Sequence, residues 1–144
     1  MVTADRIAYE QHLPEVLGLL EQVEHSLAKT DTEGLLHHLV KLRASQINGC
    51  GYCVQMHTAE ARKDGETDKR LDHLVVWRHV SDYTDKEKAA FAWCEALTEM
   101  KPDTQYSALR ATLREYFSDK DIGGLTSIIA MINLWNRLQI SNHS

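Results

Sequence analysis

The sequence predicts an all-α protein of about six to seven helices with no sheet. Only two prolines and seven glycines interrupt its 144 residues, so long regular elements are expected. Apolar residues recur at three- and four-residue steps along most of the chain, which is the spacing of one face of an amphipathic helix. No run of four to eight residues alternates apolar and polar side chains as a half-buried strand does.

The expected helices, in chain order, cover residues 14–29, 33–47, 50–64, 68–79, 84–100, about 106–117 and 119–140. Pro14 suits the first turn of the first of these helices. Asn48 and Gly49 end the second, because both residues tolerate the left-handed conformation of a helix C-cap. Thr84 and Glu87 have the spacing of a capping box, in which each side chain bonds a free amide of the first turn.

Ser118 with Asp121 is expected to cap the last helix. Gly123 and Gly124 weaken the first turns of this helix by about 1 kcal/mol per glycine relative to alanine. Close packing against a neighbouring helix is the expected reason for the pair.

Composition favours one soluble globular domain over residues 1–144, with residues 1–30 forming an N-terminal arm and helix. The formal net charge of −5 and the pI of about 5.9 argue against nucleic acid and anionic membrane as partners, since both bind basic surfaces. We expect no signal peptide and no membrane span, and therefore a cytoplasmic protein. In a reducing compartment, closely spaced cysteines are more often catalytic or metal-binding than structural.

The chemically distinctive motif is Cys-x-x-Cys-x-x-x-His, formed by Cys50, Cys53 and His57. At about 100° per residue, Cys50 and His57 are nearly eclipsed and Cys53 lies within about 60° of both, so all three share one helix face. The two cysteines are close enough to form a disulfide. A thiolate in the first helical turn is stabilised by free amides, and His57 lies one turn away to exchange a proton.

Three interpretations compete for this motif. We favour a redox-active dithiol, because of the reducing compartment, the helix start and the aligned histidine. A zinc site is disfavoured because two cysteines and one histidine leave one ligand missing. Two inert cysteines in a helix are the third interpretation, since cysteine is readily buried as a small apolar residue.

Other polar residues have weaker signals. His38 lies on the inward stripe of the preceding helix and can reach the thiols, or it is a core histidine bonded to a backbone carbonyl. Glu60 can orient His57, although an exposed carboxylate paired with Arg62 or Lys63 is the favoured interpretation. His37 is expected to be solvated and Cys94 to lie in the core. The three tryptophans are expected to serve packing rather than to stack on a ligand.

The segment from Leu39 to Glu66, LVKLRASQINGCGYCVQMHTAEARKDGE, closely resembles the core of the carboxymuconolactone decarboxylase superfamily, in its alkyl hydroperoxidase D (AhpD)-like branch. Three pieces agree with this resemblance: Val76-Trp77-Arg78, the helix containing KEKAAFAWCEALT, and INLWNR from Ile132 to Arg137. The resemblance implies an AhpD-like helical bundle that assembles into trimers or hexamers. It also implies a thiol peroxidase or disulfide reductase without metal, haem or flavin.

In the family that the motif resembles, the second cysteine attacks the peroxide and the first closes the disulfide. On this chain the resemblance therefore assigns attack to Cys53, resolution to Cys50 and proton movement to His57. The expected partners are an organic hydroperoxide and an external thiol reductant. The family commonly has a glutamate twelve residues before the first cysteine, where this chain has His38, so thiol activation is expected to differ.

Two other functions stay open from the sequence. The His38 difference favours a redox sensor or partner-binding helical oligomer whose disulfide forms without turnover. The superfamily also includes carboxymuconolactone decarboxylases, whose small-molecule chemistry is the weaker inference because those members generally lack the paired cysteines.

Overall fold

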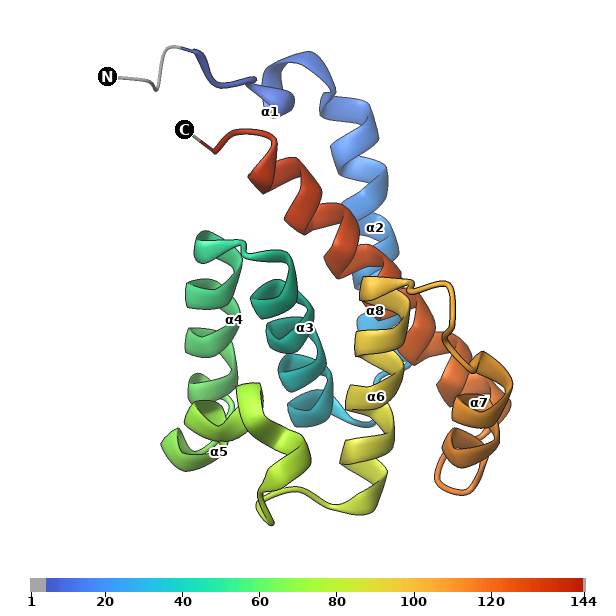
Figure 1. The fold of residues 1–144 in the computed structure, drawn as a ribbon. Helices are drawn as coiled ribbons and strands as arrows, with labels where there is room; N and C mark the ends of the chain where they lie inside the picture. The colour runs from blue at the N-terminus through green and yellow to red at the C-terminus, as the bar shows by residue number, and fades with distance from the viewer. Residues whose placement is uncertain (1–4, 144) are drawn as a thin grey trace.

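The computed structural model describes residues 5–143, and within them every regular element is helical (Figure 1). The elements are α1 (Tyr9–His12), α2 (Pro14–Lys29), α3 (Gly34–Asn48), α4 (Gly51–Lys63), α5 (Asp68–His73), the 3₁₀ helix η2 (Leu74–His79), α6 (Asp85–Glu99), α7 (Tyr106–Arg114) and α8 (Asp119–Ile140). The all-α class is confirmed. None of these helices is long and apolar enough to cross a membrane.

The predicted count of six to seven helices is slightly low, because the described residues contain eight α-helices and η2. One addition is α1, a single turn in the weakly patterned arm. The other change divides the predicted helix 68–79 into α5 and η2, with non-helical dihedrals at Val76. Three-residue steps in a 3₁₀ helix place side chains i and i+3 on one face. In η2 this spacing buries Leu74 and Trp77 together.

Helix α3 is central to the core and makes its main contacts with α4, α6 and α8 (Figure 1). Leu39 on α3, Phe91 on α6 and Ile129 on α8 are at most 1% exposed and belong to one apolar cluster. Trp77 and Tyr83 pack their rings against Phe91, with centroids 5.6 and 5.1 Å apart. This core fixes the position of α4, which carries the cysteine motif.

The predicted caps of α6 and α8 are confirmed. The Thr84 hydroxyl accepts from the Glu87 amide while the Glu87 carboxylate accepts from the Thr84 amide, and Ser118 accepts from the Asp121 amide. The expected close packing at Gly123 and Gly124 is wrong, because a Cβ added at either glycine meets no atom within 4 Å.

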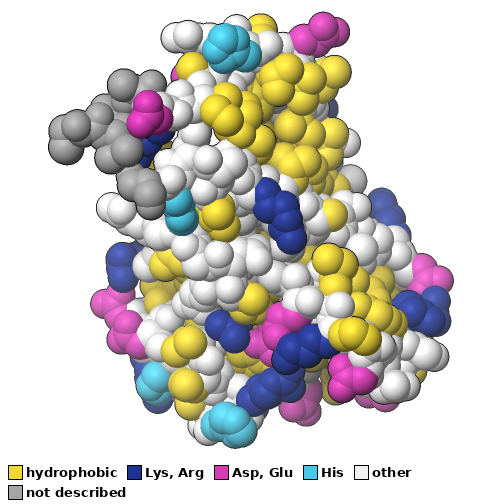
Figure 2. Space-filling model, turned by 45° about the horizontal axis from the view of Figure 1, so that its top comes forward, with side chains coloured by type: hydrophobic (Ala, Val, Ile, Leu, Met, Phe, Trp, Pro, Cys, Tyr) yellow, Lys and Arg dark blue, Asp and Glu magenta, His cyan; other side chains and the backbone are white. Residues whose placement is uncertain are grey.

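Helix α2 lies along α8 and has no buried residue. Three large apolar side chains on it, Val16, Leu19 and Val23, are 46%, 54% and 42% exposed. Figure 2 shows hydrophobic side chains gathered at the upper right of the molecule, where α2 lies. Residues 16–23 therefore present an apolar stripe on the side of α2 that faces away from the core.

Candidate redox site

The turn between α3 and α4 presents the first cysteine. Gly49 ends α3 in the left-handed conformation, with φ of 72°, and the Cys50 amide donates to the Ser45 carbonyl over 3.1 Å. Helix α4 begins at Gly51, one residue after the predicted start, with Cys50 as its N-cap. The Cys50 sulfur accepts a hydrogen bond from the Cys53 amide at 3.3 Å, a position where serine or aspartate oxygens are usual.

Cys50 and Cys53 form a disulfide, with their Cα atoms 5.3 Å apart. The prediction that the two sulfurs are close enough to bond is thereby confirmed. Cys50 is fully buried and Cys53 is 2% exposed. Because the pair begins α4, both sulfurs lie next to free amides at the positive end of the helix dipole, which favours thiolate forms after reduction.

His57 lies one turn after Cys53 and is also buried, with 6% of its surface exposed. Its Nδ1 is hydrogen-bonded to Glu60 at 3.2 Å. Since an ionised carboxylate only accepts, the proton of the neutral ring lies on Nδ1, and Nε2 is the basic nitrogen. Nε2 is buried and has no hydrogen-bond partner among the described residues. His57 is therefore arranged to accept a proton.

Burial is the main influence on the pKa of His57 and lowers it below its ordinary value of 6.5. The Glu60 carboxylate opposes this shift, whereas the nearby side chains of Lys41 and His38 add to it. The imidazole is thus neutral at pH 7 and available as a base.

His38 is connected to the site through two acidic residues, one in α4 and one at its C-cap. Its Nε2 is 2.6 Å from Asp64 and its Nδ1 is 3.9 Å from the Glu60 oxygen that also contacts His57. Among the described residues, no hydrogen bond joins His38 to either cysteine. The favoured interpretation of Glu60 is wrong, because this carboxylate contacts His57 while Arg62 pairs with Asp68.

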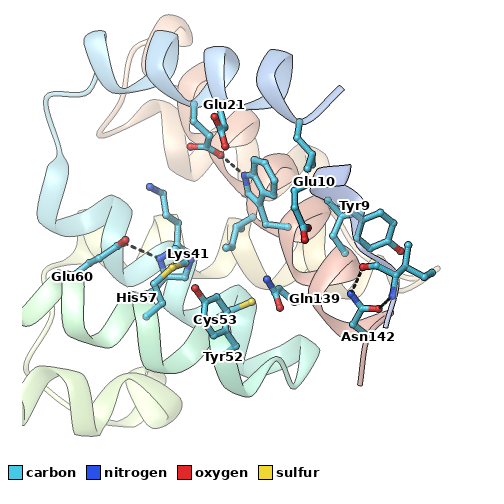
Figure 3. Close-up of a pocket in the computed structure, with 17 residues that line it drawn as sticks. Tyr9, Glu10, Glu21, Lys41, Tyr52, Cys53, His57, Glu60, Gln139 and Asn142 are labelled. Carbon is cyan, nitrogen blue, oxygen red and sulfur yellow. Dashed lines mark hydrogen bonds and ion pairs between the residues drawn. The ribbon is translucent and has the colours of Figure 1, made fainter. Parts of the chain in front are cut away.

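A cavity of about 540 Å³ opens beside Cys53 (Figure 3). Cys53, His57 and Glu60 contribute one wall from α4, and Lys41 extends it from α3. The opposite wall comes from segments distant in sequence, with Tyr9, Glu10, Leu17, Glu21 and Glu24 from α1 and α2 and Ile132, Trp135, Leu138 and Gln139 from α8. The cavity thus connects the disulfide with a space large enough for a small substrate.

The sequence reasoning missed this second wall. Trp135 was expected to serve packing, but it also lines the cavity, and its Nε1 donates to Glu24 over 2.9 Å. His37 was expected to be solvated, yet it is buried beside Asp31, with the two side chains 2.8 Å apart. Cys94 is buried as expected, and burial raises the pKa of its thiol to about 12.

A buried amide network fixes the turn that carries Cys50 against α8. Asn136 donates to the Ser45 hydroxyl over 3.1 Å, and Asn48 donates to the side-chain oxygens of Asn133 and Asn136, both over 2.9 Å. Asn136 and Ser45 are completely buried. Since every lost partner would leave a buried polar group unsatisfied, the network strongly favours one arrangement of the turn.

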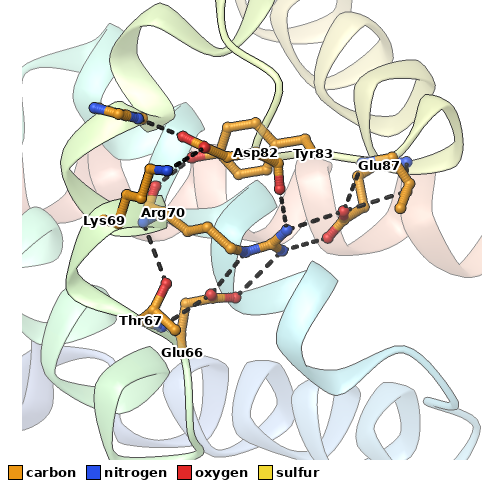
Figure 4. Close-up of polar contacts among 9 residues, drawn as sticks. Glu66, Thr67, Lys69, Arg70, Asp82, Tyr83 and Glu87 are labelled. Carbon is orange, nitrogen blue, oxygen red and sulfur yellow. Dashed lines mark hydrogen bonds and ion pairs between the residues drawn. The ribbon is translucent and has the colours of Figure 1, made fainter.

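A second polar cluster surrounds Arg70 on α5 and has a structural role (Figure 4). Its guanidinium donates to Glu66, to Glu87 and to the Asp82 carbonyl, while the Tyr83 hydroxyl donates to the Arg70 carbonyl. The hydrogen bond with Glu87 raises the pKa of Arg70 above its ordinary value. The cluster joins α5 to the start of α6.

The fold and the site define a class: an all-helical protein whose buried Cys-x-x-Cys disulfide lines a cavity next to a neutral histidine. Residues 14–96 match the Carboxymuconolactone decarboxylase family, and the chain belongs to this family. The uncharacterized protein YdfG of Bacillus subtilis (strain 168) is 33% identical over 138 residues, which cover 96% of this chain and 94% of that protein.

Two crystal structures are also similar. One is an Agrobacterium tumefaciens protein of unknown function, proposed to be the antioxidant defence protein AhpD, with a TM-score of 0.87, 37% identity, and coverage of 96% of this chain and 95% of that one. It confirms the AhpD-like resemblance. The other, an uncharacterized peroxidase-related protein of Silicibacter sp. TM1040, has a TM-score of 0.78 at 19% identity, covers 93% and 78% of the two chains, and supports the fold alone.

Proposed function

We propose that the chain is a thiol-dependent hydroperoxide reductase, or more broadly a disulfide oxidoreductase, with an antioxidant role in the cytoplasm. The observation that carries this proposal is the Cys50–Cys53 disulfide, whose Cys53 lines a cavity together with His57. The name of the Agrobacterium protein points in the same direction. The substrates would be an organic hydroperoxide and an external thiol.

In the proposed reaction, the Cys53 thiolate attacks the distal oxygen of the hydroperoxide. An S–O bond forms, the O–O bond breaks, and the alkoxide leaves as an alcohol after taking the proton that His57 Nε2 had removed from the thiol. The Cys50 thiolate then attacks the sulfenic sulfur, which forms the disulfide and breaks the S–O bond; the departing hydroxide takes up the proton that the Cys50 thiol had lost and leaves as water. Two molecules of external thiol return the pair to the reduced state.

The assignment of roles to the two cysteines follows their surroundings. Cys53 lines the cavity and would meet the peroxide, whereas Cys50 lies outside the lining residues. The amide of Cys53 donates to the Cys50 sulfur. This hydrogen bond would stabilise Cys50 as a thiolate, which suits a resolving cysteine.

A thiol count tests the proposal. The reduced protein has three cysteines, and one equivalent of cumene hydroperoxide is expected to leave only the Cys94 thiol titratable after denaturation. In Cys50→Ser the sulfenic acid on Cys53 should persist long enough to be trapped by dimedone. Serine is the suitable replacement because its hydroxyl can still cap α4.

The control is Cys94→Ala, which should lose both remaining thiols at the wild-type rate, because the pKa of buried Cys94 is too high for reaction. Full peroxide turnover by Cys53→Ser would show that the assignment is wrong.

A redox sensor is the second candidate, favoured by the burial of both sulfurs and by His38 at the position where the resemblance predicts glutamate. A sensor would form the disulfide once and consume negligible peroxide in the steady state. Measuring peroxide consumption with excess dithiothreitol separates the two functions.

A further inference from the structure

The disulfide is accessible to an incoming thiol from one direction. Cys53 and His57 line the cavity, whereas Cys50 is completely buried and does not. His57 is 94% buried, and its Nε2, the base proposed to take the Cys53 proton, has no hydrogen-bond partner among the described residues. A thiolate that enters the cavity therefore meets the sulfur of Cys53.

The wall of the cavity is strongly acidic. Glu10, Glu21, Glu24 and Glu60 line it, whereas Lys41 is the only lysine or arginine among the described lining residues. The wall thus has three negative charges in excess. No lysine or arginine of the described residues forms an ion pair with these four glutamates, so their charges are left to act on the contents of the cavity (Figure 3).

Reduction requires a negatively charged reactant to approach this wall. A thiolate RS⁻ attacks the Cys53 sulfur, the R–S–S–Cys53 bond forms, and the Cys50–Cys53 bond breaks with its electron pair on Cys50. A second thiolate attacks the sulfur of R, releases RSSR and leaves Cys53 as a thiolate. The two protons from the thiols end on the protein dithiol, so two thiols are oxidised and one disulfide is reduced.

We propose that the acidic wall selects the reductant of Cys50–Cys53 by charge, so that thiols with a cationic group are preferred and thiols with an additional anionic group are rejected. This inference rests on the proposed function and names the charge class of its reductant. A cleft lined by one sign of charge focuses the electric field and changes the local concentration of charged reactants. An ammonium group near the sulfur compensates for the thiolate charge, whereas a sulfonate adds to it.

The test compares three small thiols of similar size on the oxidised full-length protein: cysteamine, 2-mercaptoethanol and 2-mercaptoethanesulfonate. Free protein thiols are counted with maleimide, and each rate is divided by the thiolate concentration and corrected for thiol basicity. We expect the rates to fall in that order, with about a tenfold difference between the first and the last at low ionic strength. The difference should shrink as salt screens the wall.

Two variants localise the effect. The double variant Glu10→Gln and Glu21→Gln should lower the ratio of the rate with cysteamine to the rate with 2-mercaptoethanesulfonate. Glu115→Gln removes one negative charge from an exposed position at the end of α7, outside the cavity, and should leave the ratio unchanged. Equal corrected rates for the three thiols, a faster sulfonate, or an equal effect of Glu115→Gln would overturn the charge selection.

Failure of the proposed function looks different. If none of the three thiols reduced the native disulfide, the oxidoreductase itself would be refuted. If all three thiols reduced the disulfide at the same corrected rate, only the charge selection would be refuted.

Discussion

Glu60 joins two histidines that belong to different helices. One oxygen of its carboxylate is 3.2 Å from His57 Nδ1 and 3.9 Å from His38 Nδ1, while Asp64 lies 2.6 Å from the other nitrogen of His38. A glutamate at position 38 would face both of these carboxylates and be repelled, whereas a histidine complements them. The motif histidine therefore has a neighbouring carboxylate although residue 38 is not a glutamate.

The pKa of His57 gives a residue-scale prediction with opposite signs in two variants. Lys41→Met removes a positive charge and should raise this pKa, whereas Glu60→Gln removes a negative charge and should lower it further. Both values are measured by NMR titration of the His57 ring. Shifts in the same direction would contradict the assigned influences.

The lowered pKa of His57 also sets the direction in which pH changes the stability of the protein. The pKa of folded His57 lies below 6.5, so as pH falls through 6.5 the unfolded chain binds this proton first, and stability is lost towards lower pH. The base is also lost when the folded imidazole protonates. The wild-type free energy of unfolding should therefore fall between neutral pH and the pKa of His57 in the folded protein. In His57→Gln this fall should be smaller, as measured by urea unfolding at several pH values.

At the scale of the elements, the turn between α3 and α4 depends on one backbone conformation. Gly49→Ala places a side chain on a residue whose backbone is in the left-handed conformation. It should destabilise the protein by about 1 kcal/mol, even though no atom lies within 4 Å of the new Cβ. Gly123→Ala, in the helical part of α8 with equally open surroundings, should stabilise it by roughly 0.5–1 kcal/mol. Urea denaturation of the two variants provides the matched comparison.

Local patterns predicted most of the helices because their signals lie within one turn. The Thr84 capping box, Ser118 and Asn48-Gly49 are short-range patterns, and each occurs where expected. The break at Val76 has no such signal. It is imposed by burial of Leu74 and Trp77 against the core, which is a tertiary effect.

The same distinction applies to the site. The alignment of Cys50, Cys53 and His57 depends only on helical geometry, so the spacing predicted it. The second wall of the cavity, with Glu21 on α2 and Trp135 on α8, comes from segments that lie about thirty residues before the motif and about eighty residues after it. No periodicity within one helix indicates such a contact.

For the whole molecule, the exposed apolar stripe of α2 supports the proposal that the chain assembles into trimers or hexamers. Exposed apolar clusters of this kind commonly mark interaction surfaces. We expect wild-type protein at micromolar concentration to sediment as an oligomer. Leu19→Glu should lower the mass of the sedimenting species, because the substitution would bury a charge in the interface.

His25→Glu changes an exposed side chain on another face of α2 and should leave the mass unchanged. A wild-type protein that sediments as a monomer would contradict the proposed assembly.

The place of Trp135 has an optical consequence. The other two tryptophans are buried and bonded within the protein, Trp77 to Glu95 and Trp93 to Thr126. Trp135 is half-buried and lines the cavity that also contains Cys53. We therefore expect its emission to change with what fills the cavity, whereas Trp77 and Trp93 do not line it. The protein thus contains an intrinsic fluorophore whose emission can report, without any added label, what occupies the cavity beside Cys53.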